Sequence, residues 1–142
     1  MFKDILLPVD LGNQETQTKA VTAAVEIAKA FGSRLHVMTI VPNFGMSIVS
    51  GFFPANFEEQ ALEEANKQLH AFVAQAVPDD IKVQHIVAHG TIYEQILHFA
   101  KEADVDLIVM ASHRPELQDY LLGPNAARVV RHAHCSVTVV RD

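Results

Sequence analysis

Short apolar runs alternate with longer segments in which apolar residues recur every three or four positions, and this alternation constrains the fold most. The apolar runs, which we interpret as strands, cover residues 5–9, 35–41, 82–88, 106–111 and 136–141. The periodic segments, which we interpret as helices, cover residues 16–31, 58–77, 91–100 and 125–132. Strands that alternate with helices form parallel sheets with right-handed crossovers. The pattern predicts one α/β domain over residues 1–142, with an open, doubly wound, five-stranded parallel sheet and helices on both faces.

Local signals set the predicted boundaries of these elements. Gly32 is expected to close the first helix, whose apolar face runs from Ala20 to Phe31. Pro42 should stop the second strand, and His89-Gly90 should form a turn. Thr91 and the glutamate three residues later have the spacing of a capping box. Residues 82–88 alternate polar and apolar side chains, as a strand near the sheet margin does, whereas residues 106–111 are apolar enough for a central strand.

Residues 42–57 form the least regular stretch, with glycine and serine between apolar side chains. A loop of this length in a compact domain is either functional, as a lid or an interface, or folds back over the edge of the sheet. The residues leave both interpretations open.

Charge and composition exclude several classes of function. The formal net charge is −6 and no lysine or arginine cluster offsets it, which argues against nucleic acid or an anionic membrane as a partner. The single cysteine, Cys135, cannot form an internal disulfide and is expected to be a small buried thiol. No run approaches about 18 apolar residues, and the apolar stretch at the start is too short for a signal peptide. We therefore expect a cytoplasmic protein.

The carboxyl ends of the predicted strands carry the candidate site. In open α/β sheets, ligands bind beyond these ends, where the strand order reverses. A helix N-terminus at residues 123–125, with Arg114 on the facing loop, suits a phosphate group. An adenine ring could lie flat against Val9 and Ile40, with Asp10 near its polar edge or the ribose. The Asp10 carboxylate needs either a ligand or loop amides as partners.

The residues at these positions resemble the universal stress protein family. The likeness is carried by residues 5–10, the run 106–113, the segment 121–123 and the run 129–141. It covers the whole chain in length and element order, and the combination Ala-Ser-His-Arg-Pro with Tyr-Leu-Leu-Gly looks closest to the small F/G-type branch. The resemblance implies a flavodoxin-like fold, adenine-nucleotide binding and a regulatory role in the stress response.

The resemblance also implies which residues bind ATP, together with any Mg²⁺ that the nucleotide carries. The predicted nucleotide-binding residues are Pro8, Val9, Asp10, Ile40, Met110, Ala111, His113, Arg114, Gly123, Pro124, Asn125 and Ala126. The family's phosphate motif is Gly-x2-Gly-x9-Gly-Ser/Thr. Here Ala111 and Arg114 replace its first two glycines, eight residues separate Arg114 from Gly123, and Pro124 replaces the hydroxyl residue. Pro124 removes a backbone donor, whereas Arg114 adds charge and Asn125 adds a side-chain donor.

The sequence offers little for catalysis or a protein-bound metal. There are eight histidines but no Cys/His spacing of the zinc-site type, so we expect no metal site. There is no Gly-x-Ser-x-Gly elbow and no Walker lysine, so we expect no enzyme. Two alternatives stay open: a nucleotide-independent protein-interaction module, and a weak ATP hydrolase that uses Asp10 and His113.

The last predicted strand has no helix after it in this sequence. The resemblance implies that this strand pairs with its twin across a two-fold axis, which would cover an otherwise exposed sheet edge. We therefore expect a homodimer with Val137, Val139 and Arg141 in its interface, and a further, unidentified protein partner.

Overall fold

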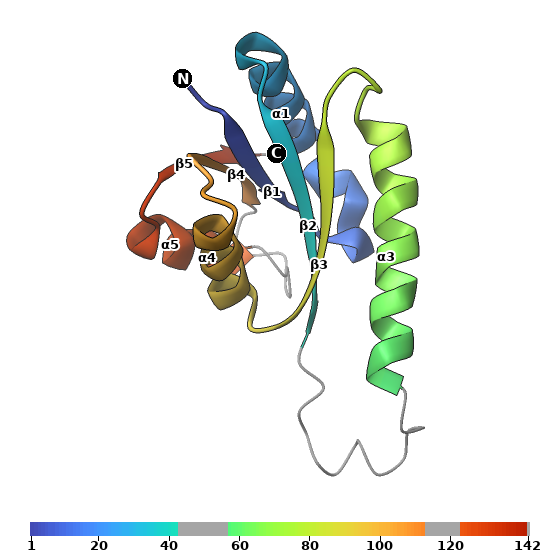
Figure 1. Cartoon of the computed structure of the whole chain (residues 1–142). Coiled ribbons are helices and arrows are strands. Elements are labelled where there is room, and N and C mark those ends of the chain that lie inside the picture. Colours follow the sequence, from blue (N-terminus) through green and yellow to red (C-terminus); the bar gives the residue numbers. More distant parts are fainter. Residues whose placement is uncertain (43–56, 113–122, 142) are drawn as a thin grey trace.

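The computed structural model of the chain describes residues 1–42, 57–112 and 123–141. Five strands and their connecting helices alternate along it, as the sequence predicts (Figure 1). In chain order, the elements are β1 (Asp4–Pro8), the 3-10 helix η1 (Leu11–Gln17), α1 (Thr18–Phe31), β2 (Arg34–Pro42), α3 (Phe57–Ala76), β3 (Val83–Gly90), α4 (Ile92–Glu102), β4 (Leu107–Ser112), α5 (Gly123–His132) and β5 (Ser136–Arg141).

The strands form one sheet in the order β3-β2-β1-β4-β5. Every neighbouring pair is parallel, so all carboxyl ends meet at one edge of the sheet. From β1, the chain first builds outward through β2 and β3, and then returns to place β4 and β5 on the other side. The strand order therefore reverses between β1 and β4. The predicted open, doubly wound, parallel sheet is confirmed.

Two apolar layers cover the two faces of the sheet. Alternate residues of a strand point to opposite faces, so Leu7 packs with α1 and α3 whereas Leu6 packs on the side of α4 and α5. Figure 1 shows α3 along one side of the sheet and α4 with α5 on the other. The central strands β1 and β4 are buried on both faces, which explains their continuous apolar sequences.

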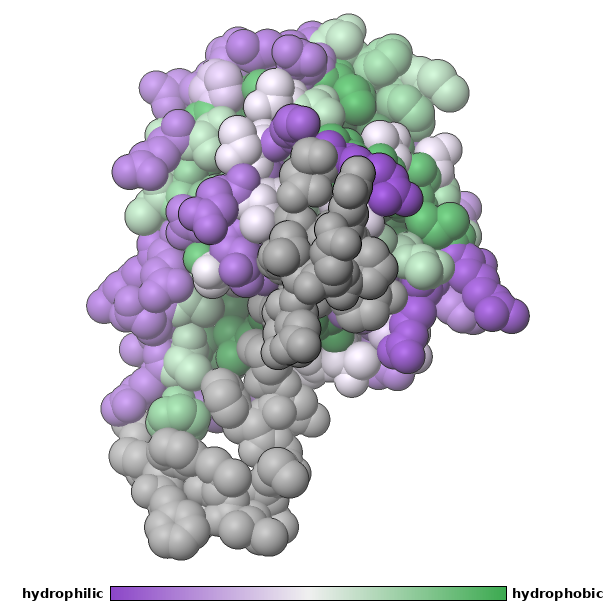
Figure 2. Space-filling model, turned by 180° about the vertical axis from the view of Figure 1, so that it is seen from behind, coloured by the Kyte–Doolittle hydropathy of each residue, from purple (hydrophilic) through white to green (hydrophobic). Residues whose placement is uncertain are grey.

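The helix α1 ends as predicted. Gly32 adopts the left-handed conformation at φ 66°, and its N–H donates to the carbonyl of Ala28. The buried face of α1 is shorter than the sequence indicates. It ends at Ala28, because Phe31 is 46 % exposed instead of buried in the core. Its ring meets that of Phe2 edge-on, with 5.5 Å between the ring centroids. Met1, the residue before Phe2, is also exposed. Figure 2 shows hydrophobic surface at the upper right of the back face.

Only the second half of α3 is anchored in the core. Leu69, Phe72 and Val73 are its buried residues. Ala61 and Leu62, which are apolar residues in the first half, are only partly buried. The flank that α3 forms is largely hydrophilic, at the left of Figure 2.

Two local predictions are wrong around the end of β3. His89 and Gly90 do not form a turn, because β3 continues through both and pairs with Val41 and Pro42 of β2. Gly90 accommodates the exit from the strand with φ 132°. Thr91 is the N-cap of α4, but its side chain makes no capping hydrogen bond, so the predicted capping box does not form. Among the described residues, no helix is both long and apolar enough to cross a membrane.

Candidate functional site

The carboxyl ends of β1 and β4 lie side by side at the point where strand order reverses. Their register pairs Ile5 with Leu107 and Leu6 with Ile108. In open α/β sheets, ligands bind at the carboxyl ends of the strands beside such a reversal. Of the residues that the sequence nominates, those at the ends of β1 and β4 are Pro8, Val9, Asp10, Met110 and Ala111.

The chain beyond β1 is fixed by hydrogen bonds. The Val9 N–H donates to the carbonyl oxygen of Met38 at 2.7 Å, which extends the pairing with β2 past the last strand residue. Val9 and Asp10 are 4 % and 3 % exposed, so both are held within the fold. The backbone of Asp10 is extended, and the residue is the N-cap of η1.

Both carboxylate oxygens of Asp10 have donors from its own loop. The Gly12 N–H donates to Oδ1 at 3.0 Å, and the Asn13 side-chain amide donates to Oδ2 at 3.0 Å. The sequence left open whether the partners of the Asp10 carboxylate are a ligand or loop amides, and the structure shows that loop donors are present. A carboxylate accepts about four hydrogen bonds, so capacity is left for a ligand. Sequence reasoning missed Gly12 and Asn13, although Asp-x-Gly-Asn is a composition typical of a turn closed by an aspartate side chain.

The predicted adenine contacts are divided between the two faces of the sheet. Val9 and Ala111 pack in the layer with α1 and α3, whereas Ile40 and Met110 pack in the layer with α4 and α5. Val9 and Ile40 would therefore meet a flat ring from opposite faces of the sheet, and the adenine contact with both residues stays a prediction. A ring at this edge can meet one side chain and the backbone ends of the neighbouring strands.

The first turn of α5 follows the described end of β4 in the chain and is fixed to the same apolar layer. Ala126 is 4 % exposed and belongs to the cluster that contains Met110 and Val129. Asn125 is partly buried, and Gly123 and Pro124 are the first two helix residues. The predicted phosphate residues His113 and Arg114 lie outside the described residues.

One buried polar group at this edge was not predicted. Gln17 ends η1 and is 1 % exposed. Its amide nitrogen donates to the Thr16 hydroxyl at 2.8 Å. Its Oε1 has no hydrogen-bond partner among the described residues. Residue 17 falls in the first turn of the predicted helix 16–31, where a glutamine gives no signal for such burial.

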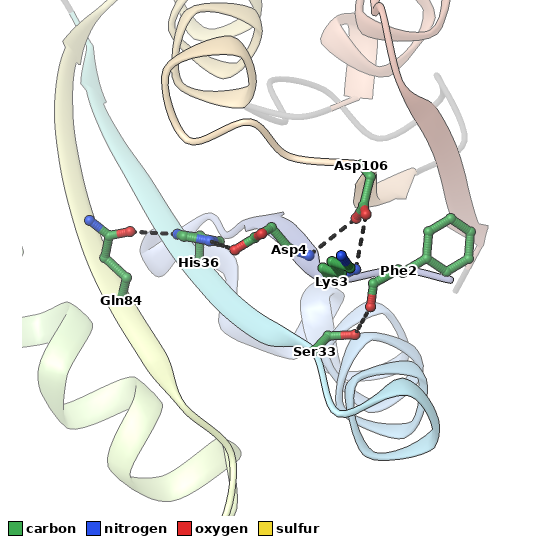
Figure 3. Close-up of polar contacts among 7 residues, drawn as sticks. All are labelled: Phe2, Lys3, Asp4, Ser33, His36, Gln84 and Asp106. Atoms are coloured by element: carbon green, nitrogen blue, oxygen red, sulfur yellow. Dashed lines mark hydrogen bonds and ion pairs between the residues drawn. The ribbon is translucent and has the colours of Figure 1, made fainter.

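A second polar cluster lies at the amino edge, away from this site (Figure 3). His36 is 3 % exposed on β2, and its two ring nitrogens lie 2.6 Å from Gln84 Oε1 and 2.9 Å from Asp4 Oδ1. The Asp106 carboxylate accepts hydrogen bonds from the backbone N–H groups of Lys3 and Asp4. These contacts join β1, β2, β3 and the start of β4, so the cluster fixes strand register at the edge opposite the candidate site.

Within the described part of the chain, no group of three His, Cys, Asp or Glu side chains is arranged to hold a metal ion. His132 and His134, which are close in sequence, are both exposed. A magnesium ion bound to nucleotide phosphates and water would need no such group.

The model of the Universal stress protein family matches residues 1–141 of this chain. The chain belongs to the universal stress protein family. It is 33 % identical over 144 residues to Universal stress protein G of Escherichia coli O157:H7, covering 99 % of this chain and 100 % of that protein. The predicted likeness to the F/G-type branch is thereby confirmed.

Solved structures share the fold of this universal stress protein. The structure of MJ0577 has a TM-score of 0.73 at 25 % identity, covering 100 % of this chain and 97 % of that one. A universal stress protein in complex with cAMP has a TM-score of 0.59 at 22 % identity, covering 99 % and 97 %. One from Archaeoglobus fulgidus in complex with dAMP has a TM-score of 0.61 at 18 % identity, covering 96 % of each chain.

The strand β5 of this universal stress protein is an edge strand, as the predicted dimer requires. Its outer side faces no other strand among the described residues. The predicted interface residues Val137, Val139 and Arg141 lie on it, and Val139 is 36 % exposed. An edge of this kind is a template for pairing with another strand.

Proposed function

We propose that this universal stress protein binds an adenine nucleotide, ATP in particular, and acts as a regulatory, non-catalytic dimer in the stress response. The observation that carries the proposal is the reversal of strand order between β1 and β4, with Asp10 just beyond the end of β1 and Met110 near the end of β4. The cytoplasmic location expected from the sequence stays a prediction.

The residues present fit an adenine nucleotide in two respects. The Asp10 loop is held in place by its own hydrogen bonds, so a ribose or adenine donor would meet a preformed acceptor. The N-terminus of α5, anchored through Ala126, offers backbone N–H groups and a positive helix dipole to phosphate oxygens. Nucleotide complexes of two structural neighbours, with cAMP and with dAMP, support the same class of ligand.

The phosphate end of the proposed site depends on Arg114. An arginine matches phosphate oxygens in charge and geometry and compensates for the donor that Pro124 lacks. Mg²⁺, where present, would enter with the nucleotide.

The test is a titration of the purified protein with ATP, ADP, AMP and cAMP by calorimetry, after any copurified nucleotide has been identified. We expect micromolar ATP binding that weakens about tenfold in Arg114→Ala, the loss of about 1.4 kcal/mol of charge-assisted hydrogen bonding. Arg131→Ala, an exposed arginine in the last turn of α5, is the matched control and should bind normally.

Each outcome separates the proposal from its alternatives. No copurified nucleotide and no binding near millimolar ATP would contradict the proposal and favour a nucleotide-independent interaction module. Phosphate release that exceeds the uncatalysed rate and disappears in His113→Ala would favour the hydrolase. Asp10→Asn is a poor test of either, because an amide at this position would face the Asn13 donor with its own N–H₂ group.

The proposed dimer has its own test. Val139→Lys should shift the protein toward monomer in sedimentation experiments, because a charged edge residue disfavours strand pairing. Thr22→Lys, at an exposed position of α1, is the control. Unchanged association of Val139→Lys would show that β5 is not the interface.

A further inference from the structure

Two histidine contacts join α3 to the edge strand β3. Near the middle of the helix, the rings of His70 and His85 are stacked, with 3.8 Å between centroids and 8° between planes. In its first turn, Glu58 Oε1 lies 2.9 Å from Nδ1 of His89. The two contacts are 12 residues apart on the helix, about 18 Å along its axis.

Protonation drives the stacked pair apart. The His70 Nδ1 lies 2.9 Å from the carbonyl oxygen of Asn66, which can only accept, so this nitrogen carries the proton of the neutral ring. A second proton on His70 and one on His85 would place two positive rings face to face. Burial lowers the pKa of His85 from its ordinary value, and the charge of His70 lowers it further.

The surroundings of His85 do not offset this repulsion. On the same face of the sheet its neighbours are Val37 of β2 and Val83 and Val87 of β3, which carry no charge. From α3 it faces His70, with the exposed Lys67 one helical turn earlier. The nearest α3 carboxylates in sequence, Glu63 and Glu64, precede His70 by six or seven residues, about 10 Å along the axis. The buried imidazole of His36 and its partner Asp4 lie on the opposite face, with α4.

Protonation has the opposite effect at the first turn. A protonated His89 ring would form an ion pair with the Glu58 carboxylate at this distance, whereas a neutral ring makes only a hydrogen bond. Glu58 is 60 % exposed, which keeps the attraction modest.

The way α3 is anchored allows the small electrostatic energies at His70 and Glu58 to affect how the helix is held. The helix has 20 residues, and its buried residues are Leu69, Phe72 and Val73, beside the stacked histidines. Repulsion at His70 therefore acts directly on the turns that hold the helix to the sheet.

We propose that α3 is a pH-responsive arm, whose anchor turns loosen from β3 on acidification while its first turn becomes more tightly held. The first-turn contact lies at the carboxyl edge of the sheet, because His89 pairs with Val41, the residue after Ile40. Acid would thus pivot α3 about the edge where ligands bind, and this response does not depend on nucleotide.

The stacked pair is tested by NMR titration of the histidine rings in the full-length protein. We expect His85 to titrate below the ordinary histidine midpoint in the wild type and to move upward in His70→Gln. His98→Gln, at an exposed position of α4 on the other layer, is the matched control and should leave His85 unchanged. A His85 midpoint that is the same in wild type and His70→Gln would overturn the proposal.

The motion is tested by hydrogen exchange at pH 7.5 and 5.5, corrected for intrinsic rates. We expect protection of the anchor turns around Leu69–Val73 to fall several-fold at the lower pH, and this fall to shrink in His70→Gln. In Glu58→Gln the first turn should lose the acid-induced protection that the wild type shows. Equal loss of protection along the whole of α3 in wild type and both variants would refute the opposed responses.

Discussion

Gly90 ends the edge strand β3 with φ 132°, a conformation that side chains other than glycine rarely adopt. A Cβ atom built there would lie 3.1 Å from the side-chain nitrogen of Gln95. Gly32, at φ 66°, offers a matched comparison, because a Cβ there would meet nothing within 4 Å. Replacing each glycine by alanine therefore compares a strained backbone beside a crowded side chain, at Gly90, with a strained backbone in open space, at Gly32.

The expected free energies of unfolding follow from two opposing terms. A strained non-glycine residue costs about 1–3 kcal/mol, and alanine recovers about 0.4–1 kcal/mol by restricting the unfolded chain. For Gly32→Ala, in the milder left-handed region, we expect a net loss below about 1 kcal/mol. For Gly90→Ala we expect a net loss of about 2 kcal/mol, because its φ is further from any allowed well. For a chain of this length that is a fall in Tm of about 6–8 °C.

Urea denaturation of both variants and of the wild type measures the difference, with unchanged m-values as the sign that the denatured state is comparable. Gln95→Ala in the Gly90→Ala background identifies the source of the loss. If backbone strain is responsible, removing the Gln95 side chain leaves the loss in place. Full recovery in the double variant, or a Gly90→Ala protein as stable as Gly32→Ala, would refute the reasoning from φ.

Three further predictions concern the core, the polar cluster and the cysteine. Leu69→Ala should lower the free energy of unfolding by about 3 kcal/mol and Leu62→Ala by under about 1 kcal/mol, by urea denaturation, because only Leu69 is fully buried. His36→Ala should lower the free energy of unfolding by about 2 kcal/mol in the same assay, because Gln84 and Asp4 lose their hydrogen-bond partner. An unchanged denaturation midpoint would exclude a structural role for the cluster. Burial, aided by the Asp106 carboxylate, raises the pKa of the Cys135 thiol, so iodoacetamide should alkylate it more slowly than free cysteine at pH 8, as mass spectrometry would show.

Much of the fold was predictable because its signals are local. Continuous apolar runs at β1 and β4 follow from burial on both faces, and the alternation in residues 82–88 follows from the position of β3 at the sheet margin. Gly32 was a reliable helix end because its left-handed conformation is a property of the residue itself. In each case the physical cause lies within a few residues of its effect.

Two of the errors, at Gly90 and Phe31, arose where a distant partner decides. Gly90 has the composition of a turn, but pairing with β2 keeps it in the strand. The Thr91 side chain has the right spacing for a cap but makes no capping bond. Phe31 fits the apolar period of α1, but Phe2, 29 positions earlier, packs against its ring at the surface. Cys135, predicted to be buried, is only partly so.

The Asp10 loop shows how far a candidate site can be inferred from residue type. A carboxylate at a strand end beside the reversal of strand order points to a ligand, yet the structure gives both of its oxygens donors from Gly12 and Asn13. Such a carboxylate has two roles, because it organises η1 and can also accept from a ribose or adenine donor. A change at Asp10 alters both roles together. Asn13→Ala removes one loop bond and leaves the carboxylate in place, so weaker nucleotide binding in this variant would measure what positioning by the loop contributes.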